Sequence, residues 1–164
     1  MRDMRYKSGF TLVEVLIATI LVGLAIASLI GANISLTRAN GVGANLSTAE
    51  FLIEQFRELT TLVGVIDPET GTDYFGSETD EAALADYDDL DDFDGKSFSP
   101  PINTNREALH SFAAFSQQIT VENVDGANFE NTVADHNSNF VRVTVRIFLN
   151  SREISSTSWI RARY

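Results

Sequence analysis

Six aspartates fall within nine residues near the middle of the chain, and carboxylates at this density can bind a divalent cation. They are Asp86, Asp88, Asp89, Asp91, Asp92 and Asp94. Ca²⁺ is favoured because it accepts six to eight oxygen ligands in irregular geometry, whereas Mg²⁺ requires a stricter octahedron. The alternative is a solvated acidic loop, because residues 67–94 hold 12 acidic side chains without Lys or Arg and like charges repel.

No other set of residues shows a pattern that catalysis requires. The two histidines, His110 and His136, lack metal-ligand spacing, and the chain has no cysteine for a thiolate zinc site. A nucleophile elbow and a phosphate-binding glycine loop are also missing from the sequence, so we predict that the protein is not an enzyme. Its net charge of −11 argues against nucleic acid as a partner, because phosphate contacts need clustered Lys and Arg.

The N-terminal residues predict a membrane span. Three basic residues, Arg2, Arg5 and Lys7, precede an apolar run in which residues 15–37 carry no charge. Roughly 20 apolar residues cross the hydrocarbon core, and the basic flank should remain cytoplasmic. A cleaved secretory signal and a plain signal anchor are the competing interpretations, although the run exceeds the roughly 7 to 15 apolar residues of a signal peptide.

Glu14 is the exception in this apolar segment. A carboxylate within a membrane helix is costly, so such residues usually have a partner and a function. The stretch Gly9-Phe10-Thr11-Leu12-Val13-Glu14 follows the basic leader and opens the long apolar run. With these flanks it resembles the cleavage and methylation site of type IV prepilins and type II secretion pseudopilins.

The resemblance implies processing by a prepilin peptidase, which cuts between Gly9 and Phe10 and methylates the new amine of Phe10. Glu14 then becomes the fifth residue of the mature chain, and it can neutralise the Phe10 amine of a neighbouring subunit. The implied partners are other pilin or pseudopilin subunits, the peptidase and inner-membrane lipid. The implied location is the bacterial inner membrane, with a periplasmic head, and then a pilus or pseudopilus filament.

Small residues recur along one face of the same helix. Every fourth position is small: Thr19, Gly23, Ala27 and Gly31. Such a stripe lets helices approach closely in lipid, where apolar character alone gives no association. The alternative is the general tolerance of membrane helices for glycine and alanine. We expect the stripe to contribute to assembly.

Changes in composition divide the chain into five segments. We predict a leader over residues 1–9, a transmembrane and filament-core helix over 10–37, an amphipathic helix half over 38–66, an acidic loop over 67–105 and a sheet over 106–164. Gly41 and Gly43 predict a bend or local melting between the helix halves. The apolar face of the second half comprises Leu46, Ala49, Ile53, Phe56, Leu59 and Val63.

The C-terminal third reads as antiparallel sheet. Apolar residues alternate with polar ones over residues 115–124 and 139–150, and a polar turn at 150–153 joins the last two strands in a hairpin. A sheet with one solvated face can pack on the amphipathic helix half. The predicted fold class is therefore α+β and pilin-like. Within the acidic loop, Tyr87, Leu90 and Phe93 recur every three residues as candidate anchors.

These features predict a structural subunit, a minor pilin or pseudopilin, of a type IV pilus or type II secretion filament. The lack of cysteine rules out a disulfide-closed C-terminal loop, which favours a minor subunit over a major one. The alternative function is a signal-anchored periplasmic binding protein whose acidic loop binds a cation. Removal of the leader ahead of the apolar run separates the two, because an anchored protein keeps its N-terminus.

Overall fold

The computed structural model describes residues 9–65, 75–76, 81, 83–135 and 137–163. The chain divides into two compact units, Met1–Ala44 and Asn45–Tyr164, and each is described by itself. Most of the predicted leader, His136 and much of the segment between residues 66 and 82 lie outside the described residues. The expectations for those positions are therefore not tested.

One helix, α1 (Leu12–Leu62), runs from the first unit into the second. The helix continues through Gly41 and Gly43, so the prediction of local melting at these glycines is wrong. The helix ends four residues before the predicted boundary at 66, because Gly64 leaves the helical path. Its N–H donates to the Asp88 carbonyl oxygen at 3.4 Å, and Gly64 pairs with Asp89 in an isolated bridge.

The first unit exposes its apolar side chains all round α1. By length and composition this helix can cross a membrane, and no part of its most apolar 18-residue stretch is buried. Hydroxyls within the run donate to carbonyl oxygens of the same helix: Thr19 to Leu16, Ser28 to Leu24 and Ser35 to Gly31. These bonds suit a hydrocarbon environment, because lipid offers no partner to a polar group.

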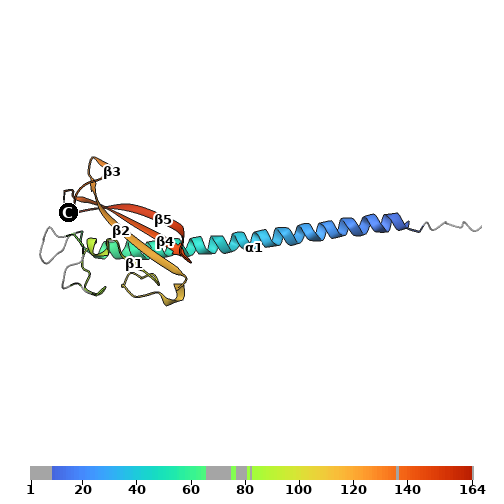
Figure 1. Cartoon of the computed structure of the whole chain (residues 1–164), viewed down its shortest axis with the longest axis horizontal. Helices are drawn as coiled ribbons and strands as arrows, with labels where there is room; N and C mark the ends of the chain where they lie inside the picture. The colour runs from blue at the N-terminus through green and yellow to red at the C-terminus, as the bar shows by residue number, and fades with distance from the viewer. Residues whose placement is uncertain (1–8, 66–74, 77–80, 82, 136, 164) are drawn as a thin grey trace, which may run out of the picture. The chain divides into compact units, whose positions relative to one another are not determined.

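The second unit contains a five-stranded antiparallel sheet in the order β1-β2-β4-β5, with β3 paired to β2 (Figure 1). Its strands are β1 (Ser97–Phe98), β2 (Phe115–Asp125), β3 (Asn128–Thr132), β4 (Phe140–Leu149) and β5 (Arg152–Ala162). The predicted hairpin of the last two strands is confirmed, since β4 and β5 pair from Phe140↔Ala162 to Leu149↔Arg152. The α+β fold class is confirmed as well.

The core of the second unit lies between the C-terminal part of α1 and one face of this sheet. The helix contributes Ala49, Leu52, Ile53, Phe56, Leu59 and Val63, and the sheet contributes Phe115, Ile119, Val121, Val141, Val143, Val145 and Ile147. Leu46, predicted for the buried face, is 46% exposed. Buried Gln117 joins the layers, because its amide donates to the Leu52 carbonyl oxygen and its oxygen accepts the Ile102 N–H.

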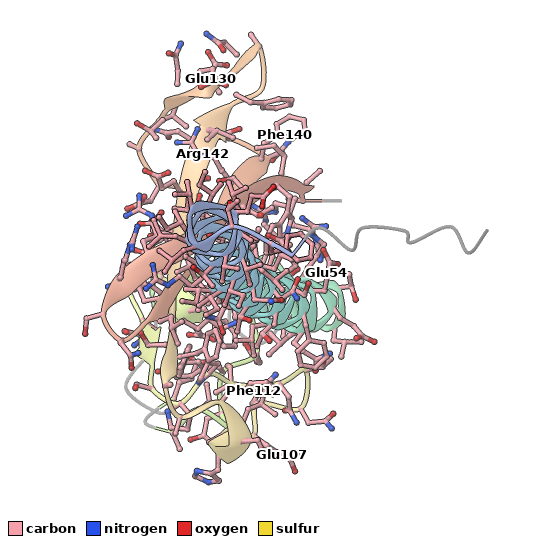
Figure 2. All side chains as sticks on the ribbon, turned by 90° about the vertical axis from the view of Figure 1, so that its right-hand side faces the viewer. Glu54, Glu107, Phe112, Glu130, Phe140 and Arg142 are labelled. Carbon is pink, nitrogen blue, oxygen red and sulfur yellow. The ribbon has the colours of Figure 1, made fainter. Side chains whose placement is uncertain are left out.

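A hairpin extends from one end of this sheet. β3 is exposed along its whole length, and Arg142 of β4 connects it to β2. The Arg142 guanidinium contacts Glu122 at 2.8 Å and donates to the Phe129 carbonyl oxygen at 3.0 Å. Figure 2 shows Arg142 and Phe140 beside the hairpin that carries Glu130. The sequence analysis did not predict β3, because its residues show no alternation of apolar and polar side chains.

The acidic segment, which is the predicted loop over residues 67–105, belongs partly to the core. A fully solvated loop is therefore the wrong interpretation of its buried residues. Tyr87, Leu90 and Phe93 are buried, which confirms them as anchors. The Phe93 ring packs edge-on against Phe56 of α1 at 5.3 Å and against Tyr87 at 5.2 Å. A short 3₁₀ helix, η1 (Asp91–Phe93), forms here. A second, η2 (His110–Phe112), precedes β2.

Candidate functional site

The predicted processing junction lies on exposed backbone just ahead of α1. Gly9 and Phe10 precede the first helical residue, Leu12, and both are exposed. The Phe10 side chain is 88% exposed, and no atom lies near the position of a Cβ on Gly9. A peptidase can therefore reach this bond without unfolding the helix.

Glu14 closes the first turn of α1 through a reciprocal pair of hydrogen bonds with Thr11. The Thr11 N–H donates to Glu14 Oε2 at 2.8 Å, and the Glu14 N–H donates to Thr11 Oγ1 at 3.2 Å. The Thr11 hydroxyl also donates to Oε2, at 2.9 Å. This is a capping box, which satisfies backbone donors that a helix start leaves unpaired. The sequence analysis missed it, although Thr-x-x-Glu before an apolar run is its signature.

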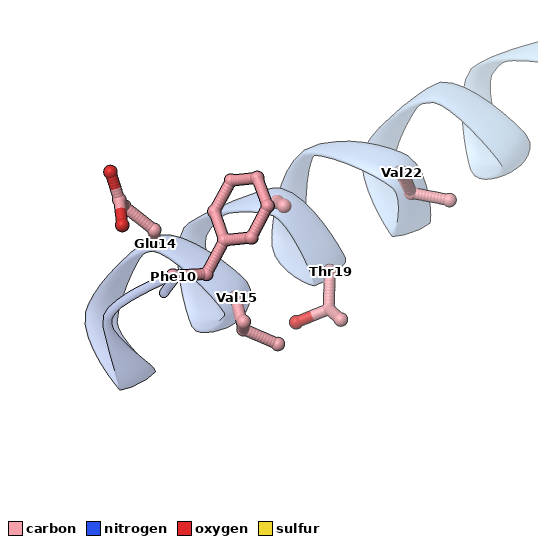
Figure 3. Close-up of a pocket in the computed structure, with 6 residues that line it drawn as sticks. Phe10, Glu14, Val15, Thr19 and Val22 are labelled. Carbon is pink, nitrogen blue, oxygen red and sulfur yellow. The ribbon is translucent and has the colours of Figure 1, made fainter. Parts of the chain in front are cut away.

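The first turns of α1 carry the other residues predicted for assembly. Figure 3 shows Phe10, Glu14, Val15, Thr19 and Val22 around these turns. An open apolar groove lies among them. Further along, nothing lies within 4 Å of a Cβ added at Gly23 or Gly31. Thr19 and Ala27, the other members of the small-residue stripe, are exposed as well.

The structure does not gather the six aspartates into one site. Three of them accept backbone N–H groups: Asp86 from Ala83 at 3.1 Å, Asp91 from Gly76 at 2.9 Å, and Asp94 from Val121 at 2.7 Å. Each of these bonds ties the segment to itself or to the sheet. These bonds hold the chain in place, and none of these three carboxylates belongs to the group of described residues that has metal-ligand spacing.

Two further aspartates, Asp89 and Asp92, accept backbone N–H groups at the start of η1. Asp89 Oδ1 accepts the N–H groups of Asp91 and Asp92 at 3.0 and 3.2 Å. Asp92 Oδ2 accepts those of Asp88 and Asp89 at 3.0 and 3.2 Å. Asp89 is 3% exposed and Asp92 is 1% exposed. Their carboxyl groups therefore help to define the fold of η1.

Burial controls the protonation of both groups. The pKa of Asp89 is raised to about 9, chiefly by loss of hydration and then by the neighbouring Asp91 and Asp92 carboxylates, although the Asp92 N–H opposes the shift. The pKa of Asp92 is also raised, to about 7, chiefly by loss of hydration and next by the neighbouring Glu81 carboxyl group, with which Asp92 can share a proton. The N–H groups of Asp89 and Asp88 oppose this second shift by stabilising the carboxylate.

One cluster of carboxylates with metal-ligand spacing occurs among the described residues. Glu81, Asp88 and Asp92 each place an oxygen within 4.8 Å of the other two. Only two of the six predicted aspartates belong to it. The sequence analysis did not include Glu81 in its candidate ligand set, because Glu81 lies seven residues before Asp88 and only the folded segment brings it close.

Taken with the fold, the N-terminal site defines a class of protein, a small α+β head carried on an apolar helix that can span a membrane. Residues 4–30 match the family model of the prokaryotic N-terminal methylation motif. This motif is the signature of type IV pilins and pseudopilins, and the recognition made from the sequence is confirmed. No curated protein and no solved structure matches the chain.

The motif has consequences for processing and partners. It implies cleavage by a prepilin peptidase and pilin-type assembly with other pilin subunits. The family it marks is structural rather than enzymatic. The single apolar helix near the N-terminus fits membrane anchoring followed by incorporation into a surface filament.

Proposed function

We propose that this chain is a minor pilin or pseudopilin, a structural subunit of a type IV pilus or a type II secretion filament. The observation that supports this function is the uncovered apolar surface of α1, which begins directly after the exposed Gly9–Phe10 junction. Before assembly, lipid covers this surface, with the N-terminus in the cytoplasm and the head in the periplasm. After assembly, the helices of neighbouring subunits cover it.

Processing is the first step of this function. The peptidase cuts after Gly9 and methylates the amine of Phe10. The cut leaves Thr11 and Glu14 intact, so the capping box persists in the mature chain. The new positive amine then stands one residue before the helix N-cap.

Assembly is the second step, and it has two contributors on α1. Glu14 supplies a negative charge for the Phe10 amine of a neighbouring subunit, which offsets the cost of holding either charge in an apolar environment. The stripe of Thr19, Gly23, Ala27 and Gly31 lets neighbouring helices approach closely. Open space at Gly23 and Gly31 means that such a contact needs no rearrangement of the subunit.

A signal-anchored periplasmic binding protein is the second candidate function, and the cluster of Glu81, Asp88 and Asp92 is the observation in its favour. In that case the cluster is the ligand site and α1 remains in the membrane. The N-terminal residues would then be retained, and the protein would not enter a filament.

Intact-mass measurement of protein from its native host tests the proposal. We expect loss of residues 1–9 and the addition of one methyl group. Gly9→Leu should block the cut, because a bulky side chain then replaces the glycine that precedes the bond to be cleaved. Gly41→Leu is the matched control, since Gly41 lies beyond residues 4–30 and has open space around it, and it should be processed normally. Retention of Met1 in the native sample would refute the pilin function.

The choice between pilus and secretion filament needs a separate measurement. Surface filaments sheared from the native host should contain the processed chain. The proteins that copurify with it, pilus subunits or secretion-system components, then identify the machine. Absence of the processed chain from both kinds of filament would favour the anchored binding protein.

A further inference from the structure

Three acidic side chains converge in the second unit although the chain offers them from separate positions. Glu81 lies in the acidic segment, Asp88 precedes η1, and Asp92 is the middle residue of η1. One oxygen from each lies within 4.8 Å of the others. Ligands on opposite sides of one Ca²⁺ ion are about 4.6–5.2 Å apart, because Ca–O distances are about 2.3–2.6 Å.

Asp92 provides an independent indication of a ligand. Its side chain is 1% exposed, and its Oδ2 already accepts two backbone N–H groups. The other oxygen, Oδ1, is buried without a hydrogen-bond partner in the described part of the chain. A buried carboxylate oxygen without a donor is costly, and native proteins usually satisfy such an atom with a donor, a water or an ion.

The chemistry of the three ligands selects the cation. All of them are carboxylates, and the chain has no cysteine, so the set matches a hard, oxygen-binding ion rather than zinc. Three carboxylates leave several positions for water or backbone oxygens. Ca²⁺ accepts such an incomplete and irregular set more readily than Mg²⁺, which requires near-ideal octahedral geometry.

We propose that Glu81, Asp88 and Asp92 form a Ca²⁺ site that fastens the acidic segment to the head. The ion lies between the three carboxylates and is coordinated by Asp92 Oδ1. This site replaces the six-aspartate site expected from the sequence. Its position beside the end of α1 follows from the hydrogen bond between the Gly64 N–H and the Asp88 carbonyl oxygen at 3.4 Å.

The site acts on the stability of the head and is independent of processing and assembly. Bound Ca²⁺ offsets the repulsion between three carboxylates, so it stabilises the folded state over the unfolded one. Without the ion, a proton shared by Asp92 and Glu81 is the competing way to relieve that repulsion. A direct Ca²⁺ titration separates a bound ion from a shared proton.

The test is a Ca²⁺ titration of the full chain in detergent micelles after treatment with a chelator. Thermal unfolding is followed by circular dichroism at pH 7.5, and binding heat is measured by calorimetry. We expect a dissociation constant of about 10⁻⁴–10⁻³ M, as for extracellular Ca²⁺ modules. The unfolding midpoint should rise by about 5 °C at 5 mM Ca²⁺, and by less at the same Mg²⁺ concentration.

Two variants and a control locate the ion. Asp92→Asn should lose the Ca²⁺-dependent shift while the amide oxygen still accepts the N–H groups of Asp88 and Asp89. Glu81→Gln should also lose it and leaves the caps of η1 untouched, so it remains informative if the first variant does not fold. Asp86→Asn is the matched control, since Asp86 is exposed and bonds only the Ala83 N–H among its described contacts. It should keep the full shift.

Two results would overturn the proposal. One is an unchanged midpoint and no heat for the wild-type chain at 5 mM Ca²⁺, which leaves the shared proton as the explanation of the cluster. The other is a shift that persists in Glu81→Gln and Asp92→Asn, which places any bound ion elsewhere. Neither result bears on the proposed filament function, because the mass test of the leader does not involve the head.

Discussion

Glu14 makes its hydrogen bonds with Thr11 of its own chain, and this changes how its charge is understood. The capping box engages Oε2 with both the N–H and the hydroxyl of Thr11. A carboxylate near a helix N-terminus also interacts favourably with the helix dipole. Glu14 therefore has a role in the isolated subunit. Pairing with the Phe10 amine of a neighbour is a separate proposal, and it needs a variant that affects the charge alone.

Glu14→Gln is that variant, because glutamine serves in a capping box as glutamate does but carries no charge. We expect Glu14→Gln to be inserted and cleaved normally and to enter filaments several-fold less than the wild type. Thr11→Ala is the matched control, since it removes the hydroxyl of the cap and keeps the charge. The measurement is the amount of each processed variant in sheared filaments, relative to the membrane fraction.

The outcome divides the two roles of Glu14. If Glu14→Gln reaches the wild-type level and Thr11→Ala does not, the carboxylate acts through capping and the amine-pairing proposal is wrong. If both variants reach the wild-type level, neither role limits assembly.

The acidic residues show what a sequence can and cannot say at this scale. Their number and density are plain in the sequence, and they led to a Ca²⁺ site made of six aspartates. In the structure, most of these carboxylates accept hydrogen bonds from different backbone N–H groups, as Asp94 does from Val121, and so they do not point to one place. Sequence spacing does not encode those directions. Glu81 was missed for the same reason, since only the fold of the acidic segment brings it near Asp92.

At the scale of elements, the sequence predicted best where periodicity is long. α1 and the strands β2, β4 and β5 have repeating apolar patterns, and the structure has each of them. β1 and η1 have only two and three residues, too few for a period to appear. They form because tertiary contacts hold them, as when Phe93 packs against Phe56.

The small-residue stripe is the element-scale feature that assembly should use. Gly23→Leu fills the middle of the stripe, and the open space around Gly23 means that the isolated subunit should tolerate it. We expect normal insertion and cleavage and a several-fold loss of incorporation into filaments, because a large side chain keeps neighbouring helices apart. The measurement is again the amount of processed chain in sheared filaments.

Ala25→Leu is the matched control for the stripe. Ala25 is also exposed and lies about 200° around the helix from Gly23, given 100° per residue. It adds similar apolar volume away from the stripe and should leave incorporation unchanged. Equal losses from Gly23→Leu and Ala25→Leu would show that the helix is packed on all sides and that the stripe has no special role.

For the whole molecule, the division into two units separates two kinds of stabilisation. The core runs from Ala49 to Trp159 and lies wholly within the second unit. The first unit exposes its apolar side chains and needs lipid or neighbouring subunits to cover them. Stability of the head and stability of the filament should therefore respond to different changes in the chain.

A head fragment of residues 39–164 tests this separation. It keeps every core residue and omits the most apolar part of α1, so it should be soluble without detergent and unfold cooperatively. We expect the fragment to lose little stability, because no core residue is removed. Since 1 kcal/mol shifts the midpoint of a small domain by about 4–8 °C, its unfolding midpoint should lie within about 3 °C of that of the full chain in micelles. Circular dichroism during heating measures both. Phe56→Ala is the control for the transition itself, since Phe56 is fully buried and its truncation should cost about 3–5 kcal/mol in fragment and full chain alike. A fragment that aggregates or melts without cooperativity would mean that the head depends on the first unit for its stability, and the two units could not then be treated as separate.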